Sequence, residues 1–337
     1  MKKILLLFLI LNNLSAIDFL KTSGDTIVNE NNEKVLLKGF GLGGWVVLEG
    51  YMWNCYIEHA STSRIENAIE YLVGPEKKNE FLNLYRKNYI TEKDVKYISD
   101  NNFNALRVPL HYRDFSPNFM EFSTEGFELL DSLIIWGNRH NIYIILDMHA
   151  APGAQNTNDF SDSEINGDSE LFTNYTKQRW LASTWKYIAN YYKDETVIAG
   201  YDLLNEPARA GAANTLRNIY EQTIDSIRTV DQKHIVFIEG NWYGNDHTGL
   251  LPPFDPNMVY SFHHYIGGII DTLTMFNQYR NDIALQYNVP LWVGEFGENS
   301  NYWGHGIKEF FNRNEIGWSW WNFKSVERIS SLFSYKI

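Results

Sequence analysis

Short apolar runs alternate with longer amphipathic segments along most of the chain. The short runs are rich in Val, Ile, Leu and Phe and predict eight strands. These strands are Val35–Gly39, Asn104–Val108, Tyr143–Asp147, Ile198–Leu203, His234–Ile238, Met258–Phe262, Leu291–Gly294 and Gly317–Trp320. The longer segments carry apolar residues at spacings of three and four, which is typical of helices with one packed face. They predict helices over Glu92–Asn101, Glu125–Asn141, Gln178–Tyr192, Leu216–Asp231, Leu273–Asn288 and Gly306–Asn314.

This order of elements is that of βα units around a parallel sheet. Eight strands with intervening helices fit a (β/α)8 TIM barrel better than an open doubly wound sheet. The sequence shows no repeat, linker or low-complexity tract, and we predict that residues 17–337 form one α/β domain. Residues 325–337 remain for a helix after the last strand.

The first residues have the features of a secretory signal peptide. Two lysines precede an apolar run, Ile4–Leu11, and Leu14–Ala16 supplies small residues suited to a signal peptidase. The apolar run is shorter than the roughly 20 residues that span a bilayer. We therefore predict a signal peptide over residues 1–16, cleavage near Ala16, and export as a secreted or periplasmic protein without a membrane span. A cytosolic protein with an apolar first strand is the alternative.

The composition excludes several classes of partner and site. Lys and Arg number 29 against 41 Asp and Glu, which gives a net charge of −12 and argues against a nucleic acid partner. Cys55 is the only cysteine, so an intramolecular disulfide and a cysteine-rich metal site are both excluded. The chain has 11 Trp, whose rings either pack in a core or stack on sugar rings. We expect a monomer.

Polar and aromatic side chains stand where the predicted strands end. In a barrel the C-terminal strand ends meet at one mouth, where the chemistry of such enzymes takes place. A strand end without a function usually carries turn residues such as Gly, Ser or Asn. The residues expected at the mouth are instead Arg107, His149, Asn205, Glu206, His263, His264, Tyr265, Glu295, Trp320 and Trp321.

Two glutamates in this set suggest a reaction. Two carboxyl groups that flank one bond hydrolyse glycosides, because one protonates the leaving oxygen while the other attacks the sugar carbon. Their pKa values must differ, and a neighbouring Arg107 would keep the attacking carboxylate ionised. A single strand-end glutamate could equally form a salt bridge to a loop. The pair Glu206 and Glu295, in this setting, favours hydrolysis.

Metal binding is the weaker interpretation. His263 and His264 are neighbours on a strand, so their side chains point to opposite faces and cannot both bind one ion. The loop after the third strand is acidic and could bind calcium, but its spacing is not that of a helix-loop-helix calcium site. We favour a solvated acidic loop and predict no metal or cofactor. The acidic residues in question are Asp159, Asp162, Glu164 and Asp168.

Six motifs between Val35 and Lys324 resemble, in order, those of glycoside hydrolase family 5, the cellulase and β-glucanase family. They are Asn104–Pro109 (NALRVP), Leu146–His149 (LDMH), Leu204–Pro207 (LNEP), His263–Tyr265 (HHY), Val293–Gly297 (VGEFG) and Trp318–Lys324 (WSWWNFK). Two further segments, His149–Asn156 and Gly39–Trp45, are similar to the exo-β-1,3-glucanase branch of that family. The resemblance implies the same barrel and a glycosidase activity.

The resemblance also implies roles for the catalytic residues. Glu206 is similar to the family's general acid/base and Glu295 to its nucleophile, in a retaining mechanism with carboxyl groups roughly 5 to 5.5 Å apart. Asn205 resembles the asparagine that binds the sugar 2-hydroxyl, an interaction that strengthens in the transition state.

Other motif residues resemble those that bind the reacting sugar. Arg107 and Tyr265 are similar to the residues that orient the nucleophile. His149 and His263 resemble the pair that lines the subsite of the reacting sugar, and Trp321 resembles the platform beneath it.

His264 and Trp320 should then point away from the site, into packing. Four more tryptophans are candidates for outer sugar platforms, with core packing about as probable for each. These are Trp45, Trp53, Trp242 and Trp303, of which we favour Trp45 as a substrate-binding residue.

We therefore expect a retaining β-glycosidase that acts on a β-glucan with β-1,3 or β-1,4 linkages. One alternative keeps the mechanism and changes the substrate to a β-mannan or a glycolipid sugar, because one barrel serves many glycans through its loops. Another is a barrel that binds carbohydrate without cleaving it. That alternative predicts the loss of Arg107, Glu206 or Glu295, and the sequence retains all three. The sequence leaves open whether the glycan is cleaved within its chain or from its end.

Overall fold

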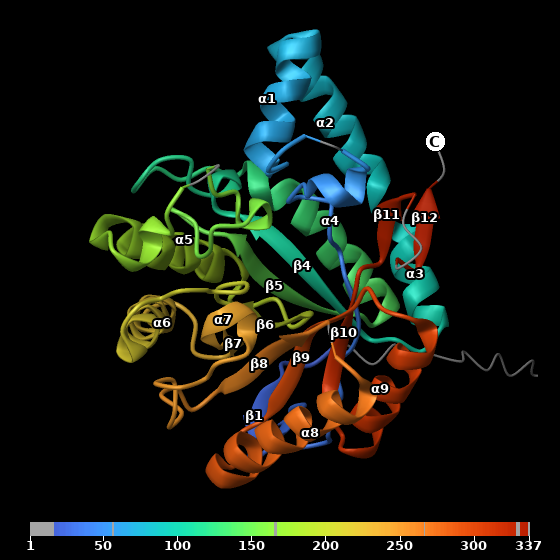
Figure 1. The fold of residues 1–337 in the computed structure, drawn as a ribbon, viewed down its shortest axis with the longest axis vertical. Coiled ribbons are helices and arrows are strands. Elements are labelled where there is room, and N and C mark those ends of the chain that lie inside the picture. The colour runs from blue at the N-terminus through green and yellow to red at the C-terminus, as the bar shows by residue number, and fades with distance from the viewer. Residues whose placement is uncertain (1–16, 56, 165–166, 266, 328–330, 336–337) are drawn as a thin grey trace, which may run out of the picture.

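Eight parallel strands close into a barrel in the order β10-β3-β4-β5-β6-β7-β8-β9, so the predicted (β/α)8 fold is confirmed (Figure 1). The computed structural model describes residues 17–55, 57–164, 167–265, 267–327 and 331–335. The predicted signal peptide lies outside these residues. The barrel strands are β3 (Lys38–Gly41), β4 (Ala105–His111), β5 (Tyr143–Ala150), β6 (Ile198–Asp202), β7 (Ile235–Glu239), β8 (Met258–His264), β9 (Leu291–Gly297) and β10 (Gly317–Trp321).

The first barrel strand begins later than the sequence predicts. The predicted run starts at Val35, but the backbone N–H of Val35 donates to the carbonyl of Ile27 and so belongs to a hairpin outside the barrel. The parallel ladder starts at Lys38, which pairs with Trp318 of β10. The register of the barrel is thus set three residues further along the chain than the apolar run indicates.

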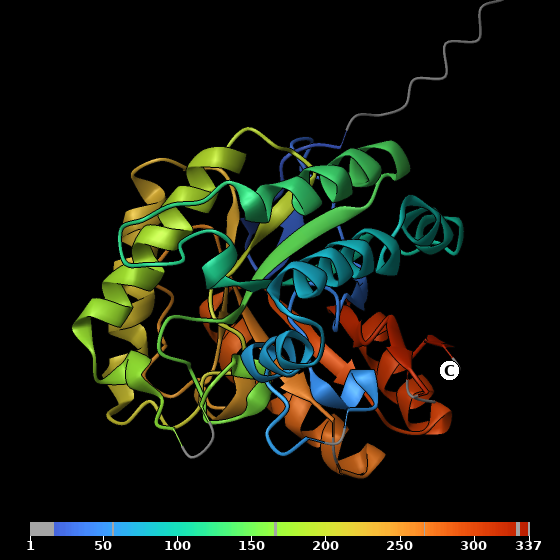
Figure 2. The ribbon, with the colours of Figure 1, turned by 90° about the horizontal axis from the view of Figure 1, so that it is seen from above.

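Helices surround the barrel, as expected for βα units (Figure 2). Six of them overlap the predicted segments: α3 (Glu92–Asp100), α4 (Glu125–His140), α5 (Tyr175–Tyr192), α6 (Ala213–Arg228), α8 (Ile269–Tyr279) with a π-helical continuation over Arg280–Leu285, and α9 (Asn301–Arg313). A four-residue element, α7 (Asn241–Gly244), follows β7. Short 3-10 turns are η1 (Gly50–Trp53), η2 (Tyr112–Asp114), η3 (Asp159–Ser161) and η4 (Glu170–Phe172). None of the described helices is long and apolar enough to cross a bilayer.

A helical hairpin, α1 (Thr62–Val73) and α2 (Pro75–Tyr89), projects from the barrel and was not predicted (Figure 1). Gly74 joins the two helices with a φ of 84°, a left-handed conformation that favours glycine. Pro75 then begins α2, where its missing N–H costs nothing. The hairpin lies between β3 and α3, so it extends the first βα connection.

The N-terminal end of the barrel is closed and apolar. Two short strands, β1 (Lys21–Ser23) and β2 (Thr26–Val28), form an antiparallel hairpin whose Leu20 and Ile27 pack into the barrel interior. The residues packed there include Ala105, Ile145, Ala199, Ile235, Phe237, Val259 and Trp292. The polar groups are therefore left to the opposite end, where the strands terminate.

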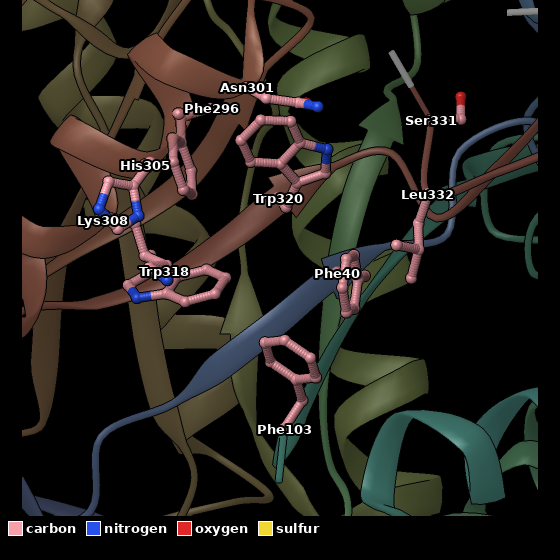
Figure 3. Close-up of a pocket in the computed structure, with 11 residues that line it drawn as sticks. Phe40, Phe103, Phe296, Asn301, His305, Lys308, Trp318, Trp320, Ser331 and Leu332 are labelled. Carbon is pink, nitrogen blue, oxygen red and sulfur yellow. The ribbon is translucent and has the colours of Figure 1, made fainter. Parts of the chain in front are cut away.

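The prediction of a helix after β10 is wrong for the part of the chain that the structure describes. Strands β11 (Lys324–Val326) and β12 (Phe333–Tyr335) pair in parallel there instead. A cavity of about 480 Å³ lies on the wall where a barrel helix would pack. Figure 3 shows the aromatic rings that face it, which belong to Phe40, Phe103, Phe296, Trp318 and Trp320.

Candidate active site

Glu295, near the end of β9, is buried and held by two donors. Arg107 donates from Nη1 to Oε1 of Glu295, and the hydroxyl of Tyr265 donates to Oε2. Burial by itself would raise the pKa of Glu295, but the charges of His263, Arg107 and His149 and the Tyr265 hydrogen bond outweigh it and lower the pKa. Glu295 is therefore an ionised carboxylate near neutral pH.

Arg107 is wholly buried and fixed on several sides at once. Its Nε donates to Asp202 at 2.9 Å, and its Nη2 donates to Asn205 Oδ1 at 2.9 Å and to Glu239 at 2.9 Å. Asp202 is the last residue of β6, Asn205 lies just after that strand, and Glu239 is the last residue of β7. The guanidinium is thereby aimed at Glu295 in one orientation.

Glu206 stands in the loop after β6 and has a φ of 49°, in the left-handed region that non-glycine residues rarely occupy. Such backbone strain is typical of functional sites. Glu239 accepts the N–H of Glu206 at 2.8 Å, and Asn156 donates to its carbonyl at 3.0 Å. Burial raises the pKa of Glu206, aided by the charges of Glu295 and Glu239 and opposed by His263. Glu206 therefore keeps its proton to a higher pH than an exposed glutamate.

His263 lies between the two carboxyl groups. Its Nδ1 is 2.9 Å from Glu206 Oε1 and 3.5 Å from Glu295 Oε2, and its Nε2 is 3.1 Å from Glu239 Oε1. Burial would lower the pKa of His263, but the charges of Glu239 and Glu295 and hydrogen bonds to Glu206 and Glu239 raise it well above its usual value. The ring is thus an imidazolium that donates from Nδ1 to Glu206 and forms an ion pair with Glu239 through Nε2.

A cavity of about 350 Å³ opens over these groups. Trp321 forms one wall, with its Nε1 donating to the Tyr51 hydroxyl at 2.8 Å. The ring of His149 lies parallel to it, at 8° and 5.4 Å between centroids, and Asp147 fixes His149 Nδ1 at 2.7 Å. The cavity is lined by Glu49, Tyr51, His149, Phe160, Asn205, Glu206, Tyr265, Glu295, Glu298 and Trp321.

The structure brings most of the expected site residues together at this mouth. They are Arg107, His149, Asn205, Glu206, His263, Tyr265, Glu295 and Trp321. The two residues expected to point away do so. His264 bonds Thr272 at 3.0 Å, and Trp320 packs its ring edge-on against Phe296.

Trp45 does not lie at the mouth, so the expectation that it binds substrate is wrong. It is 1% exposed, and its Nε1 donates to the carbonyl of Arg86 at 2.7 Å. Trp303 is also buried, and Trp53 is partly buried and bonds Tyr85. Of the four outer candidates, Trp242 alone offers an open ring, at 51% exposure.

The loop after β5 is not simply a solvated acidic segment. The side chain of Asp162 is mostly covered, accepts the N–H of Ser63 at 2.7 Å and lies 2.9 Å from His111 Nε2. Burial would raise the pKa of Asp162, but the bonds to His111 and Ser63 hold it well below its usual value. Asp162 therefore ties the loop to α1, and with it Phe160 of the cavity wall.

Several site residues were missed in the sequence. Glu239 directly follows the predicted fifth strand, so the strand-end rule that found the others would have found it too. Asp147 and Asp202 lie inside the apolar runs, where an acidic residue among apolar neighbours was the available signal. Glu49 and Tyr51 stand in the long connection after β3, and no periodicity marks them.

Glu206, His263 and Glu295 offer ligand atoms within 4.8 Å of one another, the one such group of three in the described part of the chain. A protonated His263 has no lone pair for a metal ion. The oxygens of Glu295 already face the donors of Arg107 and Tyr265. The arrangement is better suited to moving a proton than to holding a cation.

Comparison with known proteins identifies one family, whose model matches most of this chain. The family model described as Cellulase (glycosyl hydrolase family 5) matches residues 57–327. The chain is 28% identical to a protein named beta-xylosidase of Phanerodontia chrysosporium, over 91% of this chain and 71% of that protein. It is 28% identical to a probable glucan 1,3-beta-glucosidase A of Emericella nidulans, over 69% of this chain and 57% of that one.

Solved structures share the fold. A rutinosidase from Aspergillus niger superposes with a TM-score of 0.72 at 17% identity, covering 88% of this chain and 92% of that one. A structure described as an endogalactoceramidase gives 0.68 at 17% identity, over 92% and 75% of the two chains. The family match spans most of this chain, and the chain belongs to glycosyl hydrolase family 5 and is a glycoside hydrolase.

Proposed function

We propose that the chain is an exported, monomeric, retaining β-glycosidase that acts on a β-glucan, with residues 17–337 as its catalytic domain and residues 1–16 as a cleaved leader. The observation that carries this proposal is the pair Glu206 and Glu295. Their ligand oxygens lie within 4.8 Å, and their pKa values are shifted in opposite directions. Retaining glycosidases hold their carboxyl groups about 5 to 5.5 Å apart, against roughly 6.5 to 9.5 Å for inverting ones.

In the first step Glu206 gives its proton to the glycosidic oxygen as the bond to the anomeric carbon breaks. Glu295 attacks that carbon and forms a glycosyl ester. The ester carries no charge, so its repulsion of a negative charge on Glu206 disappears and the pKa of Glu206 falls. Glu206 then accepts a proton from the water that attacks the anomeric carbon, and Glu295 leaves as a carboxylate.

The sugar is positioned by groups around this pair. Trp321 offers a ring face to the sugar, and Arg107 and Tyr265 hold Glu295 for attack. The Oδ1 of Asn205 accepts from Arg107, so its NH₂ is the group left to donate to a sugar hydroxyl. His149 lines the same cavity, and His263 lies behind it against Glu206 and Glu295.

Glu49 adds a further contact. It is buried, and its Oε1 has no hydrogen-bond partner although it lies 3.9 Å from His149 Nε2. Burial, together with the charges of Glu295, Asp159 and Glu298, raises the pKa of Glu49 well above its usual value. A neutral carboxyl can donate to one sugar hydroxyl and accept from another. The cavity, at about 350 Å³, is small for a ligand site, which supports recognition of a terminal sugar.

Product analysis on laminarin and on carboxymethyl-cellulose tests this function. We expect glucose from the ends of laminarin as the first product. Aryl β-glucoside and β-xyloside are compared in parallel, because one relative bears the name beta-xylosidase. Faster cleavage of xyloside, mannan or a glycolipid would replace the glucan assignment. Sugar binding without cleavage of any of these would instead support the non-catalytic alternative.

A further inference from the structure

We propose that Glu239 is a positioning residue of the reaction, which fixes His263 and Arg107 against the two catalytic carboxyl groups. The inference rests on the proposed glycosidase function and deepens it. Glu239 is the last residue of β7, is wholly buried and is not among the residues that line the cavity. Its effect on the reaction must therefore pass through its neighbours.

One carboxylate of Glu239 reaches three parts of the machinery. Its Oε2 accepts the backbone N–H of Glu206 at 2.8 Å, which holds the acid/base residue in its strained conformation. Its Oε1 accepts from Arg107 at 2.9 Å and lies 3.1 Å from Nε2 of His263. Arg107 in turn holds Glu295, so Glu239 is connected to both catalytic carboxyl groups.

The backbone beyond Glu239 is shaped to close over it. Trp242, Tyr243 and Gly244 have φ angles of 54°, 61° and 78°, three left-handed residues in succession. For the two aromatic residues this conformation is unfavourable, and such strain persists only where surrounding contacts enforce it. A Cβ on Gly244 would lie 3.2 Å from Glu239 Oε2 and 3.2 Å from the backbone N of His263. The turn thus seals Glu239 against the ring of His263.

The charges around Glu239 make it a permanent anion. Burial would raise its pKa, but His263 and Arg107 outweigh burial and lower the pKa to about 2. The titratable groups around Glu239 are Arg107 from β4, Asp147 from β5, Asp202 from β6, Glu206 after β6, Tyr220 from α6, His247 after α7 and His263 from β8. Those around His263 are Asp202, Glu206, Glu239 and Glu295.

The sign of the effect follows from these charges. Without the Glu239 anion, burial would be opposed by Glu295 and Glu206 alone, and the pKa of His263 would fall. Glu295 would then lose a nearby cation that lowers its pKa, and its pKa would rise. The acid limb of kcat/KM, which reports ionisation of Glu295 in the free enzyme, should move to higher pH.

The test compares Glu239→Gln with Glu239→Asp and wild type in pH profiles of kcat and KM. Glu239→Gln removes the charge at nearly constant size, and its acid limb should move up by about one pH unit or more. KM should change little, because Glu239 lies outside the cavity. Glu239→Asp retains the charge and should keep the wild-type limb with a lower kcat. Asp231→Asn breaks another buried carboxylate–imidazole pair, with His234, and should leave the limb in place.

A second readout does not depend on turnover. In wild type, NMR of the imidazole nitrogens should show His263 doubly protonated at mildly alkaline pH, and in Glu239→Gln the ring should lose its second proton at a lower pH than in wild type. A neutral His263 in wild type would overturn the proposal, even if the variants do not fold. The proposal would also be overturned if kcat/KM of Glu239→Gln were lowered by the same factor at every pH, or if its pH profile matched that of wild type. Inactive wild type with a protonated His263 would instead count against the proposed function alone.

Discussion

Glu206 and Glu295 are the same residue type, and their neighbours give them opposite chemistry. Both are buried, which by itself raises the pKa of either. The side chain of Glu295 accepts hydrogen bonds from the guanidinium of Arg107 and the hydroxyl of Tyr265, whereas that of Glu206 is hydrogen-bonded to the ring of His263. The number and charge of donors therefore decide which carboxyl group loses its proton first.

This difference predicts a bell-shaped pH profile. Activity should rise as Glu295 ionises, at a pH below the usual glutamate value, and fall as Glu206 deprotonates, at a pH above it. Tyr265→Phe removes a hydrogen bond that lowers the pKa of Glu295, so the acid limb should move to higher pH. The loss in kcat/KM should be at least about tenfold, because one bond to a charged group contributes about 1.5 kcal/mol.

Tyr192→Phe is the matched control for that variant. Tyr192 is another buried tyrosine that donates to a carboxylate, Asp131, at 2.9 Å and far from the mouth. The Tyr192→Phe variant should have a lower free energy of unfolding, and its pH profile should be the same as that of wild type. If Tyr265→Phe behaves in the same way as this control, the assigned role of Tyr265 is wrong.

Glu206→Ala should affect substrates unequally. Substrates with poor leaving groups, such as oligosaccharides, need the proton of Glu206, whereas dinitrophenyl glycosides do not. We expect kcat for oligosaccharides to fall by a factor of about 100 or more, and the first step on the activated glycoside to change far less. Steady-state and burst kinetics on both substrates measure this. Equal losses on both would contradict the acid role.

At the scale of elements, the apolar runs identified all eight barrel strands because buried parallel strands are nearly all apolar. The ends of these runs then located most of the site, because the mouth of the barrel collects them. The hairpin α1–α2 and strands β1 and β2 were not predicted. Strands of three residues are too short to show a period, and a hairpin outside the barrel has no place in the alternation of βα units.

Burial of individual side chains was harder to predict than the elements themselves. Trp45 and Trp242 are indistinguishable as residues in a sequence, yet one is in the core and the other is half exposed. The difference between them comes from tertiary contacts. Trp45 donates a hydrogen bond to the carbonyl of Arg86 on α2, a helix that was not predicted. Glu49 was missed for a similar reason, because its place depends on how the long connection after β3 folds back over the mouth.

The α7 turn suggests a platform for the leaving sugar. The N–H of Tyr243 donates to the carbonyl of Pro207, so Trp242 stands beside the acid/base residue with half its surface open. Trp242→Asn removes the ring while tolerating the left-handed backbone. KM for oligosaccharides should rise about fivefold, for a lost stacking contribution of about 1 kcal/mol. KM for β-glucosyl fluoride, which has no leaving sugar, should be unchanged.

Tyr71→Asn provides the control for this variant. Tyr71 is an exposed aromatic residue near the tip of α1 and should affect neither substrate. A Trp242→Asn variant with unchanged KM for oligosaccharides of every length would refute the platform.

At the scale of the whole molecule, the barrel has an apolar end sealed by the β1–β2 hairpin and a polar end that holds the site. The barrel closes where β10 pairs with β3, and the chain then continues into the separate β11–β12 pair. Lys324 of β11 is buried and bonds Asp94 of α3 at 2.7 Å and the carbonyl of Tyr89 at 2.8 Å. This pair ties the last described strands to the first helices.

Lys324→Ala should therefore destabilise the fold by about 3 kcal/mol, because it leaves the largely buried Asp94 without its cationic partner. Denaturant unfolding measures the change. Lys96→Ala breaks an exposed pair with Asp100 on the same helix, α3, and should change stability by less than about 0.5 kcal/mol. Equal effects of the two substitutions would show that the Lys324 pair does not secure the barrel.

The central claim is that Glu295 forms a covalent ester with the sugar while Glu206 serves as acid and base. Its most direct test is mass spectrometry of peptides from protein treated with a dinitrophenyl 2-fluoro-β-glucoside, which forms the ester quickly and loses it slowly. We predict one fluoroglucosyl group, on the peptide that contains Glu295, and none on folded Glu295→Ala, which should still bind sugar but not cleave it. A label on Glu206, or wild-type turnover in Glu295→Ala, would contradict this account.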